Sequence, residues 1–214
     1  MIDAKSVEKW LEYRKHGIGG SDAACIIGKN KYKSNVQLWR EKCGLITPPD
    51  ISDKPAVKYG KAAESHIRAM FALDYPEYDI DYHEFGMWST PEQPFIFATL
   101  DGELTEAESG RHGILEIKTT TIQNVAQWEE WDNKIPDSYY VQILHQMLAT
   151  GWEFAILRAY IRYYRYGKLN ATVRDYTINR VDEEENLQYL FGKEKEFYNC
   201  IINKKEPALI LPEI

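Results

Sequence analysis

Two neighbouring hydrophobic runs, FIFATLDGEL at residues 95–104 and GILEIKT at residues 113–119, carry the charged side chains Asp101, Glu116 and Lys118. Apolar runs of this length on either side of a short polar turn predict a pair of β-strands. Side chains alternate between the two faces of a strand, so Glu116 and Lys118 should point the same way, opposite to their apolar neighbours. The pattern therefore predicts two carboxylates and one ammonium converging at the end of a hairpin. Such a set can hold a divalent cation and a polarised water against a phosphodiester.

Each of these residues also has a plainer explanation. Asp101 precedes Gly102, and Asp-Gly favours a type I′ hairpin turn. The charges within residues 113–119 are equally typical of the exposed face of an alternating strand. For Glu64, further upstream, the plainer explanation is a side chain that snorkels to solvent or pairs with a lysine. The combination favours a site, because Glu64 shares the apolar stripe of a predicted helix with Gly60, whose missing side chain leaves space for a metal or a ligand.

Composition limits the class of protein. The chain has 214 residues, of which 44% are hydrophobic and 13% aromatic, and this predicts one ordered globular domain, residues 1–214. The net charge of −7 argues against a general nucleic-acid binder but not against a nuclease, whose active site is itself acidic. Three distant cysteines without CxxC spacing disfavour structural zinc and iron–sulfur clusters and indicate a reducing compartment. They are Cys25, Cys43 and Cys200.

The N-terminus carries charges where a signal peptide needs an apolar core, and no window of the sequence reaches the length that spans a membrane. We therefore expect a soluble, intracellular protein.

Hydrophobic periodicity, capping residues and prolines predict the order of elements. Ser21 and Asp22 are expected to cap the second helix. Helices are expected at about residues 6–15, 23–27, 34–44, 55–73 and 183–203, and a helical pattern over 123–151 is interrupted near Pro136. Strands are expected at 80–88, 95–104, 114–119, 154–164 and 171–178. This order predicts an α/β or α+β fold with a mixed central sheet flanked by helices. It comprises an N-terminal helical region to about residue 55, a core over about 56–180 and a C-terminal helix.

Ordered blocks of sequence carry a family resemblance. Asp101, Glu116 and Lys118 match the PD-(D/E)xK nuclease core, with Leu100 where the motif often has proline. The flanking blocks are WLEYR at 10–14, GIGGSDAA at 17–24, IGKNKYKSNVQLWREKCGL at 27–45, YGKAAE at 59–64 and YVQILHQMLATG at 140–151. In this order they resemble the YqaJ-like viral recombinase family, relatives of lambda exonuclease. The resemblance covers about residues 10–151 and implies a restriction-endonuclease-like core.

The resemblance also implies roles for the charged core. Glu64, Asp101 and Glu116 would bind Mg²⁺, with Mn²⁺ as the alternative, and the backbone carbonyl of Ile117 would be a further ligand. Lys118 would orient or deprotonate the attacking water and stabilise developing charge.

Two residues in the N-terminal blocks occupy positions that hold phosphate in the family, the terminal 5′-phosphate in the exonucleases. They are Arg14 and Ser21. The chemistry agrees, because a guanidinium forks onto phosphate and a helix N-terminus attracts anions. The plainer explanations are a solvated helix arginine and an ordinary N-cap.

Gln142 is expected on a polar helix face that the resemblance turns toward the active site, as a catalytic residue. The second glutamine of the family's usual Gln-x-Gln pair is Leu144 here, and Gln146 or His145 could supply the missing hydrogen bond.

The implied activity is Mg²⁺-dependent 5′→3′ degradation of one strand of linear double-stranded DNA, which releases 5′-mononucleotides and leaves 3′ single strands for recombination. The resemblance also implies a homotrimer, a single-strand annealing protein as partner, and a phage or prophage gene expressed in the bacterial cytoplasm. Three alternatives stay open: an endonuclease with the same core, a catalytically silent DNA-binding or assembly module, and a plain α/β scaffold. Residues 158–168 interleave arginine and tyrosine, which fits either a DNA-facing hairpin or a solvated sheet edge.

Overall fold

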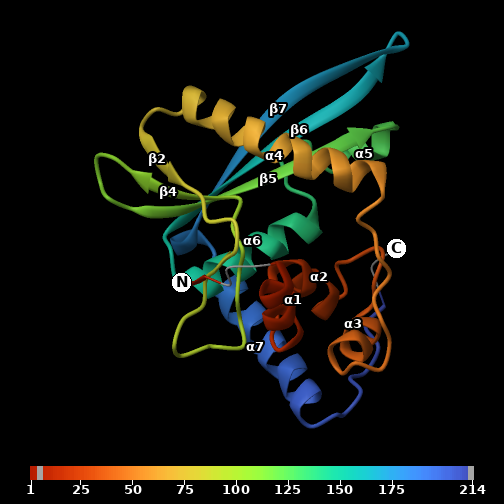
Figure 1. Ribbon diagram of the computed structural model, residues 1–214. Helices are drawn as coiled ribbons and strands as arrows, with labels where there is room; N and C mark the ends of the chain where they lie inside the picture. The colour runs from red at the N-terminus through yellow and green to blue at the C-terminus, as the bar shows by residue number, and fades with distance from the viewer. Residues whose placement is uncertain (4–6, 212–214) are drawn as a thin grey trace.

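A five-stranded mixed sheet with the strand order β2-β4-β5-β6-β7 forms the centre of the computed structural model, which describes residues 1–3 and 7–211 (Figure 1). β5 and β6 are parallel, and the other neighbouring pairs are antiparallel. The five strands are β2 (Tyr78–Asp81), β4 (Gly102–Glu106), β5 (His112–Ile122), β6 (Phe154–Arg165) and β7 (Lys168–Asn179). The short strands β1 (Ile2–Asp3) and β3 (Gly86–Met87) pair separately.

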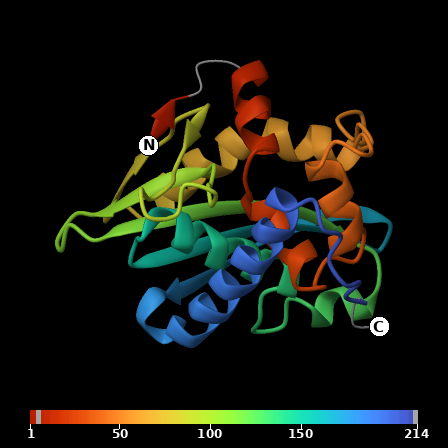
Figure 2. The same ribbon diagram turned by 90° about the horizontal axis from the view of Figure 1, so that it is seen from below.

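Helices cover both faces of this sheet. The long helix α4 (Pro55–Asp74) crosses one face, and α6 (Asp137–Thr150) covers the other (Figure 1). Viewed from below, α7 (Glu184–Ile202) runs beside α6, and α2 (Gly20–Ile26) packs against α6 as well (Figure 2). The remaining helices are α1 (Val7–Lys15), α3 (Asn35–Lys42) and α5 (Val125–Glu129). None of the helices within the described ranges is long and apolar enough to cross a membrane.

The alternation of side chains along β5 divides the core between the two faces. Leu115 and Ile117 pack with Ile67 and Phe71 of α4. Ile114 belongs instead to the cluster on the α6 side. This alternation, read from the sequence, is present in the structure and sends residues 116 and 118 toward α6.

The predicted strand over residues 95–104 is wrong in its extent. β4 begins only at Gly102, and the segment before it makes isolated bridges, in which Ile96 pairs with Ile18 and Ala98 with Trp88. These long-range partners satisfy the backbone of the segment outside the main sheet. Asp101 therefore precedes a strand, and the reversal between β4 and β5 lies at residues 107–110 instead of at Asp-Gly. The predicted strand over 80–88 is likewise divided between β2 and β3.

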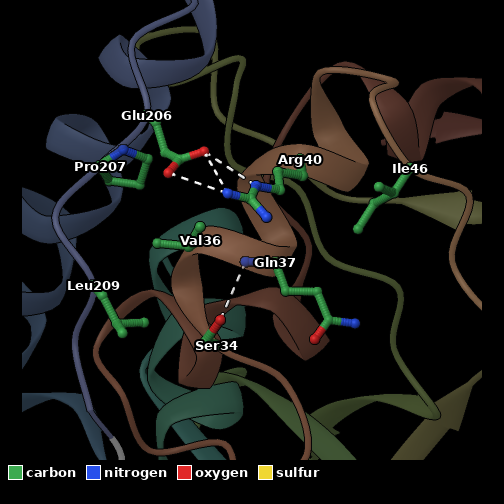
Figure 3. A pocket seen from close by; sticks show the side chains of 8 residues that line it. All are labelled: Ser34, Val36, Gln37, Arg40, Ile46, Glu206, Pro207 and Leu209. Atoms are coloured by element: carbon green, nitrogen blue, oxygen red, sulfur yellow. Dashed lines mark hydrogen bonds and ion pairs between the residues drawn. The ribbon is translucent and has the colours of Figure 1, made fainter.

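The chain returns along α3 after α7 (Figure 3). Arg40 pairs with Glu206 at 3.0 Å, and Ser34, the N-cap of α3, accepts the backbone N–H of Gln37 at 3.2 Å. A surface pocket of about 510 Å³ lies between this segment and α3. None of the residues predicted to act on a substrate lines it.

A buried ion pair ties α4 to the far strands of the sheet. The Arg158 side chain, 2% exposed, donates to both oxygens of Asp175 at 2.9 and 2.8 Å and lies 2.8 Å from Asp74. The Tyr75 hydroxyl donates to Asp175 at 3.0 Å. The first arginine of the basic 158–168 run is therefore buried and paired within the chain, and does not lie on a solvated surface.

The Asp175→Asn variant is expected to lose about 2 kcal/mol of unfolding free energy, less than the usual cost of breaking a buried pair because Asp74 remains. Urea denaturation measures this loss. Because neither Arg158 nor Asp175 is among the residues predicted to act on DNA, the same variant should retain wild-type DNA cleavage at 25 °C. A stability equal to wild type would show that Asp74 alone satisfies the guanidinium.

Candidate active site

The unpaired edge of β5 is where the predicted residues gather. β4 pairs with β5 only as far as the Gly102–Leu115 pair, whereas β5 continues to Ile122. Asp101, just before β4, accepts the backbone N–H of Ile117 through Oδ2 at 2.8 Å. In an extended strand the N–H and C=O of one residue point to the same side, so the Ile117 carbonyl faces the same opening.

Glu116 and Lys118 project from β5 toward α6, and one glutamine bridges them. Lys118 Nζ lies 2.6 Å from Glu116 Oε1. Gln142 donates its amide to Glu116 Oε1 at 2.7 Å and accepts from Lys118 Nζ at 3.0 Å. Gln146 donates to the other Glu116 oxygen at 2.6 Å. Both oxygens of this buried carboxylate are therefore fixed by side-chain amides.

Leu144, at the position of the family's second glutamine, is buried in the apolar core. Gln146 supplies the second amide, whereas His145 turns toward α7. Of the two substitutes considered from the sequence, the geometry selects the glutamine.

Glu64 approaches from α4, on the other face. Its Oε1 accepts from Arg68 at 2.6 Å, and the Arg68 guanidinium lies 3.5 Å from the centre of the Tyr82 ring. The apolar pattern of the sequence does not indicate Arg68 as the partner of Glu64, but the four-residue spacing of the two side chains on one helix does. Gly60 opens no empty space: a Cβ there would lie 3.3 Å from Thr119 Oγ1, so the glycine lets α4 approach β5 closely.

The carboxylates at this edge act on one another electrostatically. Burial raises the pKa of Asp101 well above its usual range, and the charges of Glu116 and Glu64 raise it further. Burial also raises the pKa of Glu64, against the opposing charge of Arg68. For Lys118, burial lowers the pKa, but the charges of Glu116 and Asp101 outweigh it and the net pKa is raised. Excess negative charge is thus concentrated at a buried edge.

A divalent cation fits this donor set chemically. Carboxylate and carbonyl oxygens are the ligands that Mg²⁺ and Mn²⁺ prefer, and a cation would relieve the repulsion that raises the Asp101 pKa. Across residues 1–3 and 7–211, no three His, Cys, Asp or Glu side chains are grouped closely enough to hold a metal ion. Lys118 and Arg68 pair with Glu116 and Glu64 in this structure, and cation binding would shift both pairs.

A second pocket, of about 490 Å³, borders this edge. It is lined by Tyr139, whose ring centre lies 5.0 Å from Lys118 Nζ, and by Thr120 of β5. Space large enough for part of a substrate therefore adjoins the charged cluster.

Arg14 and Ser21 form a separate pair beside the cluster. Arg14 Nη2 donates to Ser21 Oγ at 3.0 Å, and its guanidinium lies 4.4 Å from the centre of the Trp10 ring. A Cβ at Gly20 would lie 3.1 Å from Gln142 Cγ, so this end of α2 abuts the glutamine that holds Glu116.

The expected cap of α2 is confirmed for Asp22 and wrong for Ser21. Gly19 occupies the N-cap position with φ −105°, and its N–H donates to Asp22 Oδ2 at 3.0 Å. Asp22 therefore caps from the third helical position, held also by Lys42 at 2.7 Å. Ser21 lies inside the first turn and exposed, which leaves its hydroxyl available to Arg14.

Comparison with known proteins places this geometry in a family. The model of the YqaJ-like viral recombinase domain matches residues 9–153, which include every predicted site residue. The chain belongs to the YqaJ-like viral recombinase family. The uncharacterized protein YqaJ of Bacillus subtilis (strain 168) is 31% identical over 206 residues, which cover 95% of this chain and 59% of that protein. The chain thus spans about three fifths of the length of this curated relative.

Solved structures show the same fold. An alkaline exonuclease (LHK-Exo) from Laribacter hongkongensis superposes with a TM-score of 0.60 at 19% identity, covering 92% of this chain and 97% of that one. A phage related exonuclease from Haemophilus somnus 129PT superposes with a TM-score of 0.55 at 12% identity, covering 88% of this chain and 96% of that one. The predicted restriction-endonuclease-like fold of this YqaJ-like chain is confirmed.

Proposed function

We propose that this chain is a metal-dependent deoxyribonuclease that degrades the 5′-ended strand of linear double-stranded DNA, releases 5′-mononucleotides and leaves 3′ single strands for recombination. One observation carries the proposal: Asp101, Glu116 and Lys118 meet at the unpaired edge of β5, with two glutamines fixing the glutamate. Membership of the viral recombinase family supports it, as does the fold shared with two exonucleases.

Glu64, Asp101, Glu116 and the Ile117 carbonyl would hold the cation, Mg²⁺ with Mn²⁺ as the alternative. The cation would neutralise phosphodiester charge and make a water more acidic. Asp101 accepts the Ile117 N–H through Oδ2, which would leave its other oxygen for the cation. Asp101 and Glu116 are thus held by hydrogen bonds before a substrate arrives, whereas the Glu64–Arg68 pair would shift when the cation binds.

Lys118 would orient the attacking water and stabilise charge on the phosphate oxygens. Its raised pKa keeps Nζ protonated at neutral pH, which favours charge stabilisation over proton abstraction. Gln142 accepts from Nζ at 3.0 Å and so limits where the ammonium can move. The chain's own contribution is therefore a fixed positive charge beside a fixed carboxylate.

Arg14 and Ser21 would bind the terminal 5′-phosphate of the strand being degraded. A bidentate guanidinium and a hydroxyl donor are matched to phosphate oxygens. Burial lowers the pKa of Arg14 but leaves it charged, with Asp22 opposing the shift. Their position beside Gln142 would set the distance from the strand end to the bond that is cut.

The Arg14→Ala variant is expected to cleave 5′-phosphorylated ends about 10- to 100-fold more slowly, the loss of one or two charge-assisted hydrogen bonds. On ends with a 5′-hydroxyl, the variant and the wild-type protein should cut at the same rate. The exposed Arg40→Ala change is the matched control and should leave both rates unchanged. An equal loss on both kinds of end would show that Arg14 does not read the phosphate.

The wider setting is part of the same proposal. Residues 1–214 would form one nuclease domain that assembles as a homotrimer and works with a single-strand annealing protein. The gene would be carried by a phage or prophage and the protein would act in the bacterial cytoplasm. Light scattering of the purified protein tests the trimer, which should have three times the mass of the chain.

A further inference from the structure

A buried histidine–glutamate pair joins α6 to α7 close to the charged cluster. His145 and Glu194 are both 0% exposed, and Nδ1 of the ring lies 2.6 Å from Glu194 Oε1. Nε2 lies 2.9 Å from the carbonyl oxygen of Phe97. Both ring nitrogens face oxygen acceptors, so Nε2–H donates to Phe97 and a second proton lies between Nδ1 and Oε1.

This ring connects the segments that carry the site. The Phe97 N–H donates to the Ile18 carbonyl at 3.0 Å, and the Ile18 N–H donates to the Phe95 carbonyl at 2.7 Å. The same ring lies against the start of α2, where a Cβ on Gly20 would be 3.7 Å from His145 Cδ2. His145 therefore contacts α7, the segment that leads to Asp101, and the loop that leads to Ser21.

The pair also lies close in sequence to the two glutamines whose side-chain amides hold Glu116. Gln142 and Gln146 lie three residues before and one residue after His145 on α6, and both donate to Glu116. A rotation or shift of α6 would move the two amides relative to the segment ending in Asp101. The hydrogen bond from His145 Nε2 to the Phe97 carbonyl holds α6 against the segment that leads to Asp101.

Stability alone does not account for this arrangement. A buried ion pair is on average no more stabilising than apolar side chains of the same volume. In addition, Glu194 Oε2 is buried with no hydrogen-bond partner, which is an energetic cost. Directional hydrogen bonds add to the apolar packing of α6 a preference for one orientation of the helix.

We propose that His145 and Glu194 are positioning residues of the nuclease, which orient α6 so that Gln142 and Gln146 hold Glu116 in register with Asp101. Glu194 lies on α7, beyond the family-matched residues 9–153, so a helix outside the matched domain completes the catalytic architecture. The proposal rests on the proposed function for its kinetic consequence but not for its structural one.

The test compares two substitutions of nearly equal size in the full chain. Glu194→Gln keeps the hydrogen bonds, because its amide can donate to Nδ1 while Nε2–H still donates to Phe97. Glu194→Met removes the bond to α7. Each variant is measured for kcat and KM on 5′-phosphorylated linear DNA. The side-chain amide NMR signals of Gln142 and Gln146 are recorded without DNA.

Glu194→Met should lower kcat by roughly 10- to 100-fold, the cost of a small misplacement of catalytic groups, with KM within about twofold. The Gln142 and Gln146 signals should shift with it. Glu194→Gln should restore wild-type kcat and wild-type signals. Asp175→Asn, which disturbs a buried pair elsewhere, should lower stability without moving kcat or the two amide signals.

Wild-type kcat and unmoved amide signals in Glu194→Met would overturn the proposal, as would loss of kcat in Glu194→Gln with the signals in place. If Glu194→Met does not fold, the double change His145→Leu with Glu194→Leu, which leaves neither side chain polar, is judged by the same criteria. If the wild-type protein cleaves no DNA, the proposed function fails, and the amide signals alone decide whether the pair positions α6.

Discussion

Replacing Lys118 with alanine is expected to lower kcat on linear double-stranded DNA by on the order of 10³-fold, the usual effect of removing a charge that stabilises the transition state. Lys118 is the cation nearest to Glu116, at 2.6 Å, and its pKa is raised by the carboxylates around it. The substitution removes that charge while Gln142 and Gln146 still hold the glutamate. KM should change little, because the phosphate-binding pair lies elsewhere.

Single-turnover release of mononucleotides measures this effect. The matched control is Lys58→Ala on α4, where the lysine is exposed and pairs with Asp53, and its rate should equal wild type. If the Lys118→Ala protein keeps more than a tenth of the wild-type kcat, Lys118 does not act in the chemical step.

The Asp101→Asn substitution is expected to separate activity from stability. Cleavage should fall by about 10³-fold or more, because an amide is a poor ligand for a hard divalent cation beside two glutamates. Folding should become more favourable, because burial and the charges of Glu116 and Glu64 oppose ionisation of Asp101. The asparagine oxygen can still accept the Ile117 N–H.

The sign of the pH dependence follows from the raised pKa. The folded protein holds the Asp101 proton more tightly than the unfolded chain, so wild-type stability falls as the pH rises past the unfolded pKa of about 3.9 toward the folded value. The Asp101→Asn variant has no carboxyl group at this position, so its stability does not fall with pH in this way. In the absence of metal its thermal midpoint should exceed wild type by about 2–4 °C at neutral pH, and the difference should vanish in acid.

Differential scanning calorimetry with EDTA measures the shift, and exposed Asp81→Asn is the control. Adding Mg²⁺ should raise the midpoint of the wild-type protein and leave that of Asp101→Asn unchanged. A less stable Asp101→Asn protein would contradict the repulsion assigned to this edge.

Local patterns were sufficient to predict where several residues of the candidate site lie. Alternation along β5 correctly placed Glu116 and Lys118 together, because a strand buried on both faces leaves only two directions for a side chain. The prediction of helix α4 was based on Pro55 at its start and on its apolar stripe. The helical pattern was expected to end at residue 151, and Gly151 is the C-cap of α6 with φ +76°.

Long-range pairing decided what the sequence did not show. Residues 95–98 have strand-like composition, but their hydrogen bonds go to Ile18 and Trp88, which no local pattern predicts. The partner of Glu194, His145, and one partner of Arg158, Asp74, are also distant in the chain. Polar residues on amphipathic helices such as α6 and α7 read as solvent-facing, and only the packing of the two helices shows that His145 is fully buried.

The most direct test of the proposed function uses purified protein, linear double-stranded DNA with 5′-phosphate ends, and closed circular DNA of the same sequence. Each is incubated with Mg²⁺ or with EDTA, beside the Lys118→Ala protein. Our account predicts mononucleotide release from the linear DNA only, abolished by EDTA and by the substitution. Cutting of the circles would instead establish an endonuclease, and binding without cleavage of either substrate would establish a catalytically silent DNA-binding module.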